Sequence, residues 1–207
     1  MPQPWPAISE ASVSGATIYR KGECPVPYDS PVILLTGRPG IGKTTVVKKV
    51  VSLLGADAGG FYTREMRACG SRIGFEIVTL DGQRAYLASK GPEITFASGV
   101  PFGKYWLNLD GIDSVAVPAL VQALDQGKVI VVDEIGPMEI RSRRFCETVM
   151  RVLDSNVPVV GTVVKRPNDF ADRVKAHRRV TVTSVTLENR DTLPSPIVSA
   201  LARSTGD

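Results

Sequence analysis

The stretch PVILLTGRPGIGKTTVVKKVVSLL, Pro31–Leu54, decides the fold of this chain. A short apolar run leads into a loop with three glycines, and apolar residues then recur at helical spacing. We therefore predict a buried strand, a tight loop and a helix over Lys43–Leu54, with Gly55 as the stop signal.

Within this stretch, GRPGIGKT (Gly37–Thr44) matches G-x-x-x-x-G-K-[ST] at every fixed position. Glycines let the backbone fold tightly around phosphate groups, and the N–H groups at the start of the next helix face the anion. We expect Lys43 to bridge the β- and γ-phosphates and the Thr44 hydroxyl to ligate Mg²⁺. The predicted nucleotide-binding residues of this loop are Gly37, Arg38, Pro39, Gly40, Ile41, Gly42, Lys43, Thr44 and Thr45.

A second stretch, VIVVDEIGPMEI (Val129–Ile140), places acids at the end of an apolar strand. A phosphate-binding loop needs a second Mg²⁺ anchor at such a position, and we assign it to Asp133. Glu134 is predicted to polarise the attacking water and, with Lys43, to be catalytic; the alternative is an ion pair that orients an arginine. Glu139 is expected to be a surface or capping residue.

The residues Asp133–Gly136 also spell D-x-x-G, the pattern that switch GTPases use at the γ-phosphate. That interpretation requires a later N-K-x-D segment for guanine recognition, and the sequence contains none. Guanine-specific switching is therefore not expected.

Apolar strands and helices alternate along the rest of the chain. Extended segments flank the turn dipeptide Asp81-Gly82, which predicts a hairpin. Further strands are expected from GGFYT, KVIVVD, PVVGTVV and RVTVTSVT, and helices over 114–126 (opened by Asp113 or Ser114), 143–154, 169–176 and about 194–202. Strands that are apolar on both faces imply a largely parallel sheet covered on both sides. The prediction is an α/β three-layer sandwich, mostly parallel with an antiparallel hairpin portion.

The domain organisation and location follow from composition. Prolines break up residues 1–30, so we predict an N-terminal extension followed by one domain over 31–207. Hydrophobic content of 43% and charged content of 22% are typical of a soluble protein. No apolar run could cross a bilayer and no secretory signal is evident, so a cytoplasmic, non-membrane protein is expected. We interpret Cys24, Cys69 and Cys146 as unpaired thiols and His177 as a surface residue near a helix end.

The net charge of +4 fits a polyanionic small ligand as well as nucleic acid. Basic clusters at Arg141/Arg143/Arg144 and Arg173–Arg179 are interpreted as solvated helix faces, because no aromatic residues are interleaved among them for base stacking. Nucleic acid is therefore not expected as a partner, and a monomer is predicted.

Six segments occur in an order that resembles a known family: LTGRPGIGKTT, GFYTREMR, RIGFEIVTLDG, DEIGPMEI, VVGTVV and TLENRDTLP. From Pro31 onward the chain is similar to the THEP-type nucleoside-triphosphatases, a small P-loop group that includes the cancer-related nucleoside-triphosphatase of animals. GFYT followed by RIGF and then DEIGPME is specific to this group. Residues 1–30 have no counterpart there.

The resemblance implies a RecA-like α/β sandwich and Mg²⁺-dependent hydrolysis of ATP, GTP, CTP and UTP to diphosphate and phosphate. It also implies a second nucleotide-contacting segment: Val129, Ile130, Val131, Val132, Asp133, Glu134, Ile135 and Gly136. Arg67 and Arg72 match family arginines near the hairpin, and Lys104, in GKY, matches a family position for lysine or glutamine. These three residues could stabilise charge in cis, with ordinary surface ion pairs as the alternative. Arg64 and Lys165-Arg166-Pro167 depart from the family pattern and leave the base preference open.

Two other functions remain alternatives. A nucleotide or small-molecule kinase would use Arg141, Arg143 and Arg144 as part of a lid, although no long arginine-rich insertion follows the loop. A nucleotide-gated RNA-binding protein would use the basic patches.

Overall fold

The structure is a computed structural model that describes residues 30–91, 96 and 99–202. Its elements in chain order are β1 (Val32–Thr36), α1 (Lys43–Leu54), η1 (Gly55–Asp57), β2 (Ala58–Ala68), β3 (Ser71–Thr79), β4 (Arg84–Ser89), β5 (Val100–Phe102), β6 (Tyr105–Leu107), α2 (Leu109–Gly111), η2 (Ile112–Ala116), α3 (Val117–Asp125), β7 (Val129–Ile135), η3 (Glu139–Arg141), α4 (Arg143–Asp154), β8 (Val159–Val163), α5 (Asp169–Lys175), β9 (Val180–Ser184) and α6 (Pro194–Ala202). The segment η2 is a π-helical turn, and η1 and η3 are 3₁₀ turns.

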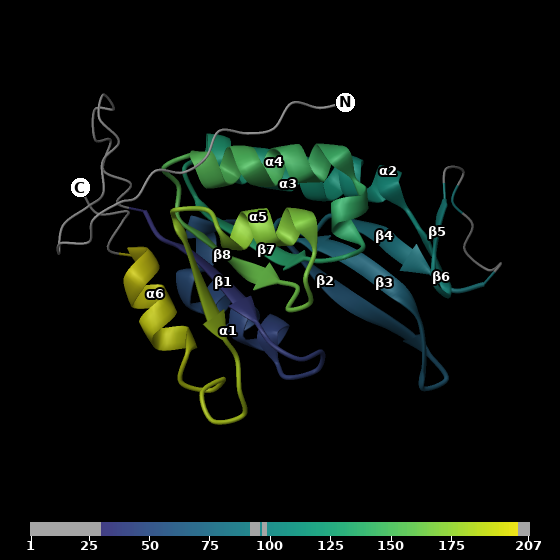
Figure 1. The fold of residues 1–207 in the computed structure, drawn as a ribbon, viewed down its shortest axis with the longest axis horizontal. Helices are drawn as coiled ribbons and strands as arrows, with labels where there is room; N and C mark the ends of the chain where they lie inside the picture. Colours follow the sequence, from purple (N-terminus) through teal and green to yellow (C-terminus); the bar gives the residue numbers. More distant parts are fainter. Residues whose placement is uncertain (1–29, 92–95, 97–98, 203–207) are drawn as a thin grey trace.

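One sheet contains all nine strands of the described residues, in the order β5-β6-β4-β3-β2-β7-β8-β1-β9. The strands from β2 to β9 in this order pair in parallel, and the strands from β5 to β2 pair antiparallel. Figure 1 shows the antiparallel half on the side of the molecule opposite α6. The two halves meet at β2.

Alternate residues of the central strands enter two separate cores. In β1, Val32 and Leu34 pack into the core that includes residues of α3, α4 and α5, whereas Ile33 and Leu35 pack into the core that includes residues of α1 and α6. The helices therefore cover opposite faces of the sheet (Figure 1). The predicted α/β three-layer sandwich is confirmed.

The antiparallel half is larger than the single hairpin that we predicted. The turn at Asp81-Gly82 is present, with Gly82 at φ 95° and the Thr79 N–H donating to the Gln83 carbonyl at 3.0 Å. The additional strands β5 and β6 were missed. Each has only three residues, which is too short to show a strand period in sequence.

The helix predicted over 114–126 begins earlier, so its assigned cap was wrong. The helical segment starts at Leu109, where the Asn108 side chain accepts a hydrogen bond from the Gly111 N–H at 3.1 Å. It continues through η2 into α3. Asp113 instead accepts from the Ser142 hydroxyl, which also caps α4. Several residues with capping side chains lie close together here, and tertiary contacts decide which one caps.

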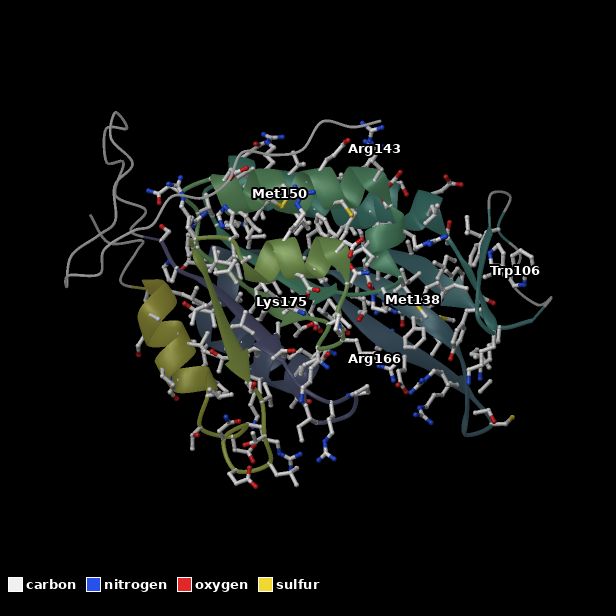
Figure 2. All side chains as sticks on the ribbon, in the orientation of Figure 1. Trp106, Met138, Arg143, Met150, Arg166 and Lys175 are labelled. Atoms are coloured by element: carbon white, nitrogen blue, oxygen red, sulfur yellow. The ribbon has the colours of Figure 1, made fainter. Side chains whose placement is uncertain are left out.

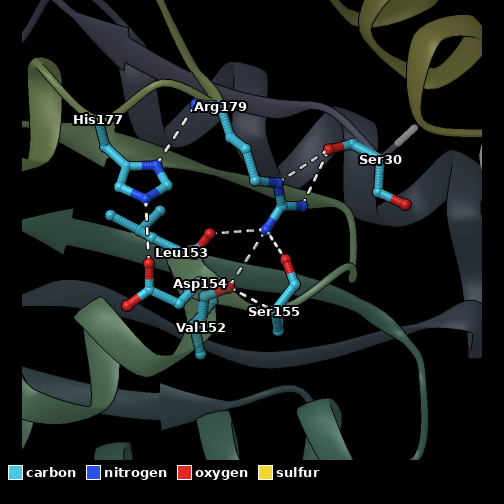
Figure 3. Close-up of polar contacts among 7 residues, drawn as sticks. All are labelled: Ser30, Val152, Leu153, Asp154, Ser155, His177 and Arg179. Carbon is cyan, nitrogen blue, oxygen red and sulfur yellow. Dashed lines mark hydrogen bonds and ion pairs between the residues drawn. The ribbon is translucent and has the colours of Figure 1, made fainter. Parts of the chain in front are cut away.

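Arg179 is buried, which corrects its interpretation as part of a solvated face. It is 8% exposed, and its guanidinium donates to the carbonyls of Leu153 at 2.8 Å, Ser30 at 2.9 Å and Val157 at 2.7 Å, and also to that of Ser155. Figure 3 shows this group joining the end of α4 to Ser30, two residues before β1. The last carbonyls of a helix lack intrahelical partners, so a cation with several donors satisfies them.

His177 also differs from its prediction. It follows the end of α5 as expected, but its side chain is only 11% exposed and is not a surface group. Its Nε2 lies 3.3 Å from Asp154 Oδ1, and its Nδ1 accepts from the Arg179 backbone N–H at 3.4 Å (Figure 3).

The predicted N-terminal extension and Cys24 lie outside the described residues, except for Ser30. Cys69 and Cys146 are free of disulfides, as predicted. In the described part of the chain, no helix has both the length and the apolar character that a membrane span requires.

Candidate functional site

The loop Gly37–Thr44 joins β1 to α1 as the motif predicts. Gly42 occupies the position before α1 with φ 109°, a left-handed conformation that favours glycine. The Val46 N–H donates to the Gly42 carbonyl at 3.0 Å, which starts the helix. Ile41 is buried, whereas Arg38, Pro39 and Gly40 are exposed. The buried Ile41 side chain therefore anchors the loop, and the rest of the loop is open to solvent. The N–H groups at the start of α1 can bind an anion there.

Lys43 lies between the loop and the acidic end of β7. Its Nζ is 3.5 Å from the Gly37 carbonyl oxygen, across the loop. Its charge lowers the pKa of both Asp133 and Glu134, against the larger opposing effect of burial. The structure thus brings together the two motifs that lie about 90 residues apart in the sequence.

Asp133 is buried, with 1% of its surface exposed. Burial raises its pKa, although the Thr162 hydroxyl donates to Oδ1 at 2.5 Å and the nearby Thr44 hydroxyl acts in the same lowering direction. The second carboxylate oxygen, Oδ2, is buried without a hydrogen-bond partner among the described residues. An acceptor left unsatisfied in this way is rare, which makes it a candidate ligand atom.

Glu134 is half-buried next to Asp133, and the peptide bond between them is cis. Burial raises its pKa, the Asp133 charge adds to the effect, and the Lys43 ammonium opposes it. A carboxyl group with a raised pKa close to a lysine charge is a candidate to accept a proton from water.

Glu139 was wrongly predicted to be a surface or capping residue. It is 5% exposed, and burial, with the charges of Glu134 and Asp133 adding to the effect, raises its pKa to about 8. A Cβ at Gly136 would come 2.8 Å from Glu139 Oε2 and 3.3 Å from Glu134 Cδ, so both glutamates flank this glycine. The sequence feature that could have indicated this burial is the position of Glu139 between Met138 and Ile140, which pack against the core.

Most of the predicted segment Val129–Gly136 does not face the site. Val129, Ile130, Val131, Val132 and Ile135 are at most 3% exposed and belong to the two cores. The residues of this segment at the site are therefore its polar end, Asp133 and Glu134, with Gly136.

The candidate arginines for charge stabilisation occupy surface ion pairs. Arg67 and Arg72 both bind Glu65, Arg67 at 2.7 Å. Tyr62 pairs with Asp133 across β2 and β7, and Arg67 lies five residues further along β2. At about 3.3 Å per residue, Arg67 is about 16 Å along the strand from the residue paired with the acid, which favours the ion-pair alternative.

The remaining basic candidates are also on the surface. Arg64 binds Glu76 at 2.5 Å, and Lys165 and Arg166 are exposed. Arg143 binds Glu147 at 2.7 Å and projects from α4 on the side away from the sheet (Figure 2). The structure gives the kinase lid no support at this residue.

Two contributors were missed in the sequence. Thr162, in β8, reaches Asp133 because β8 pairs with β7. The loop after β9 lies against the phosphate-binding loop: a Cβ at Gly37 would be 3.0 Å from the Val185 carbonyl, and one at Gly42 would be 3.6 Å from Arg190 Cδ. The TLENRDTLP segment could have indicated this contact only if β9 were known to pair with β1.

A Walker-type loop after a parallel strand, facing an acid at the carboxyl end of a second parallel strand, defines the P-loop nucleoside-triphosphatases. The sequence model of the NTPase family matches residues 32–198. The nucleoside-triphosphatase THEP1 of Thermotoga sp. (strain RQ2) is 42% identical over 175 residues, covering 84% of this chain and 98% of that protein. The THEP1 of Aquifex aeolicus is 40% identical over 182 residues, covering 83% and 99%.

Two solved structures are similar. The crystal structure of THEP1 from the hyperthermophile Aquifex aeolicus has a TM-score of 0.73 at 37% identity and covers 82% of this chain and 98% of that one. The solution structure of a human cancer-related nucleoside triphosphatase has a TM-score of 0.71 at 34% identity and covers 86% and 100%. The chain belongs to the THEP1 nucleoside-triphosphatase family, and it is an enzyme that hydrolyses nucleoside triphosphates.

Proposed function

We propose that this enzyme hydrolyses the nucleoside 5′-triphosphates ATP, GTP, CTP and UTP to the diphosphate and phosphate in a Mg²⁺-dependent reaction. The observation that carries the proposal is the Asp133 carboxyl group, which is fixed by Thr162 through one oxygen and has its other oxygen unpartnered in the described structure beside Thr44 and Lys43.

The residues present fit a magnesium ion. A threonine hydroxyl and a carboxylate oxygen are both oxygen ligands of the kind that Mg²⁺ takes, and the ion commonly binds through few protein groups plus phosphates and water. Thr44 and Asp133 would hold it. When bound, Mg²⁺ neutralises charge on the β- and γ-phosphates.

The protein groups have separate tasks in the proposed reaction. The N–H groups at the start of α1 and the Lys43 ammonium bind phosphate oxygens. Glu134 orients a water molecule and accepts its proton as the water oxygen attacks the γ-phosphorus, and the bond to the leaving diphosphate breaks. The broad base tolerance is supported by the lack of an N-K-x-D segment in the sequence.

Phosphate release from each of the four triphosphates tests the proposal. The wild-type protein should release phosphate from all four with Mg²⁺, and chelation should abolish the release. Lys43→Ala is the control, because it removes the ammonium at the loop. Release from one base only would refute the broad tolerance, and release that survives chelation would refute the role of the metal.

A further inference from the structure

The loop that joins β9 to α6, residues 185–193, is tied to the neighbourhood of the phosphate-binding loop. The Val185 N–H donates to the Thr36 carbonyl at 2.8 Å, at the point where β1 ends. Further along, Asp191 Oδ1 lies 2.9 Å from Lys49 Nζ, on α1. The loop after β9 is therefore held beside the strand and the helix that carry the phosphate-binding loop.

Arg190, in this loop, lies against the start of α1. A Cβ placed on Gly42, the residue before the helix, would be 3.6 Å from Arg190 Cδ. The side chain keeps 42% of its surface exposed, although its Nε lies 3.7 Å from Asp191 Oδ2. The N–H donors of a guanidinium group lie in its plane, so this ion pair does not occupy the face of the group. Arg190 is therefore accessible to a ligand that binds at the phosphate-binding loop.

The strand order indicates which end of a bound nucleotide lies near Arg190. β1 lies between β8 and β9, and β7 follows on the far side of β8. Asp133 and Glu134 are on β7, so the γ-phosphate is expected on the β7 side of the loop. The nucleoside then lies at the opposite side, toward β9 and Arg190. This orientation rests on the proposed function, which assigns the metal and the attacking water to the two acids.

A planar cation suits the base of a nucleotide. A guanidinium group stacks on aromatic faces, and every base has such a face. Stacking requires no particular pattern of donors and acceptors on the base, so it tolerates purines and pyrimidines alike. We propose that Arg190 is the base-binding residue of this enzyme and holds the nucleoside by stacking its guanidinium plane on the base.

The test compares ADP with tripolyphosphate, which carries phosphates and no base. Isothermal titration calorimetry with Mg²⁺ measures both affinities for the full wild-type chain and for Arg190→Gln. The variant should bind ADP about tenfold more weakly, as for the loss of one stacking contact with a base. Its affinity for tripolyphosphate should be unchanged, which also shows that the variant is folded.

The control is Arg143→Gln, because Arg143 is an exposed, ion-paired arginine on α4 that projects away from the sheet (Figure 2). It should leave both affinities unchanged. Arg190→Lys keeps the charge without the plane, so its affinity for ADP should stay near that of Arg190→Gln. Titrations with GDP, CDP and UDP should show that Arg190→Gln weakens the binding of all four diphosphates.

Three results would overturn the proposal. Unchanged ADP affinity in Arg190→Gln would remove the contact, an equal loss for ADP and tripolyphosphate would place Arg190 at a phosphate, and a loss for one base only would exclude stacking. Because the measurement is binding and not turnover, the proposed function fails separately. A protein that binds all four diphosphates through Arg190 but hydrolyses a single triphosphate would refute the proposed function and leave the role of Arg190 standing.

Discussion

Three acids lie between Asp133 and Glu139, and their surroundings distinguish them. Asp133 receives a hydroxyl from Thr162, Glu134 lies half-buried near Lys43, and Glu139 is enclosed behind Gly136. The order of apolar and acidic residues predicted the position of the first two. The burial of Glu139 depends on the 3₁₀ turn η3 packing against the core, and that contact has no periodic signal in the sequence.

Glu139 should make stability depend on pH. Its pKa in the folded state is about 8, above its ordinary value of 4.5. Between pH 4.5 and pH 8, the folded protein keeps a proton on Glu139 that the unfolded chain releases. The stability that this proton contributes is therefore complete below pH 4.5 and is lost as the pH rises to 8. Glu139→Gln carries no such proton. The free energy of unfolding of the variant should therefore rise relative to wild type by up to about 1.4 kcal/mol per pH unit in this window.

Urea unfolding at intervals from pH 5 to pH 8 measures this difference. Glu147→Gln, at an exposed glutamate on α4, is the control. Its free energy of unfolding should change with pH in the same way as that of the wild type. The charges of Asp133 and Glu134 also act on Glu139. Both residues are present in the wild type and in the Glu139→Gln variant, so their own titration largely cancels in the difference between the two free energies of unfolding. Parallel curves for wild type and Glu139→Gln would show that Glu139 is not held neutral.

At the scale of elements, several helices were predicted well. The observed α1 and α4 have the predicted bounds, Lys43–Leu54 and Arg143–Asp154. The segment through α2, η2 and α3 was predicted too short, because its first turns pass through a π-helical segment that departs from the regular helical period. The strands β5 and β6 exist through pairing to β4, which a local pattern cannot show.

Arg179 joins elements that are far apart in sequence, so its removal should destabilise the fold. Arg179→Met leaves the carbonyls of Leu153, Ser155 and Val157 without this donor. Because an unsatisfied buried polar group costs about 1–3 kcal/mol, we expect a loss of about 3 kcal/mol or more in the free energy of unfolding.

Chemical denaturation of purified variants measures this loss. Arg144→Met is the matched control, because Arg144 is an exposed arginine near the start of the helix whose end Arg179 binds. The control should change stability by less than about 0.5 kcal/mol. Equal, small effects of the two substitutions would show that the Arg179 contacts do not support the fold.

At the scale of the whole molecule, the parallel half of the sheet assembles the site. The carboxyl ends of β1 and β7 lie at one edge of the sheet, with β8 between them, so the loop after β1 faces the acids of β7. The alternation of apolar strands and helices predicted this half of the fold, and two motifs predicted the site. The contributions of Thr162 and Arg190 required the strand order, which the sequence leaves open.

In the proposed reaction, Glu134 activates water at the site that Lys43 and Asp133 assemble. The most direct test is Glu134→Gln, with nucleotide affinity and turnover measured on the same preparation. We expect unchanged affinity and a loss of roughly 10²-fold or more in turnover, as for other positioned catalytic groups. Turnover equal to that of the wild-type enzyme would exclude Glu134 from the reaction.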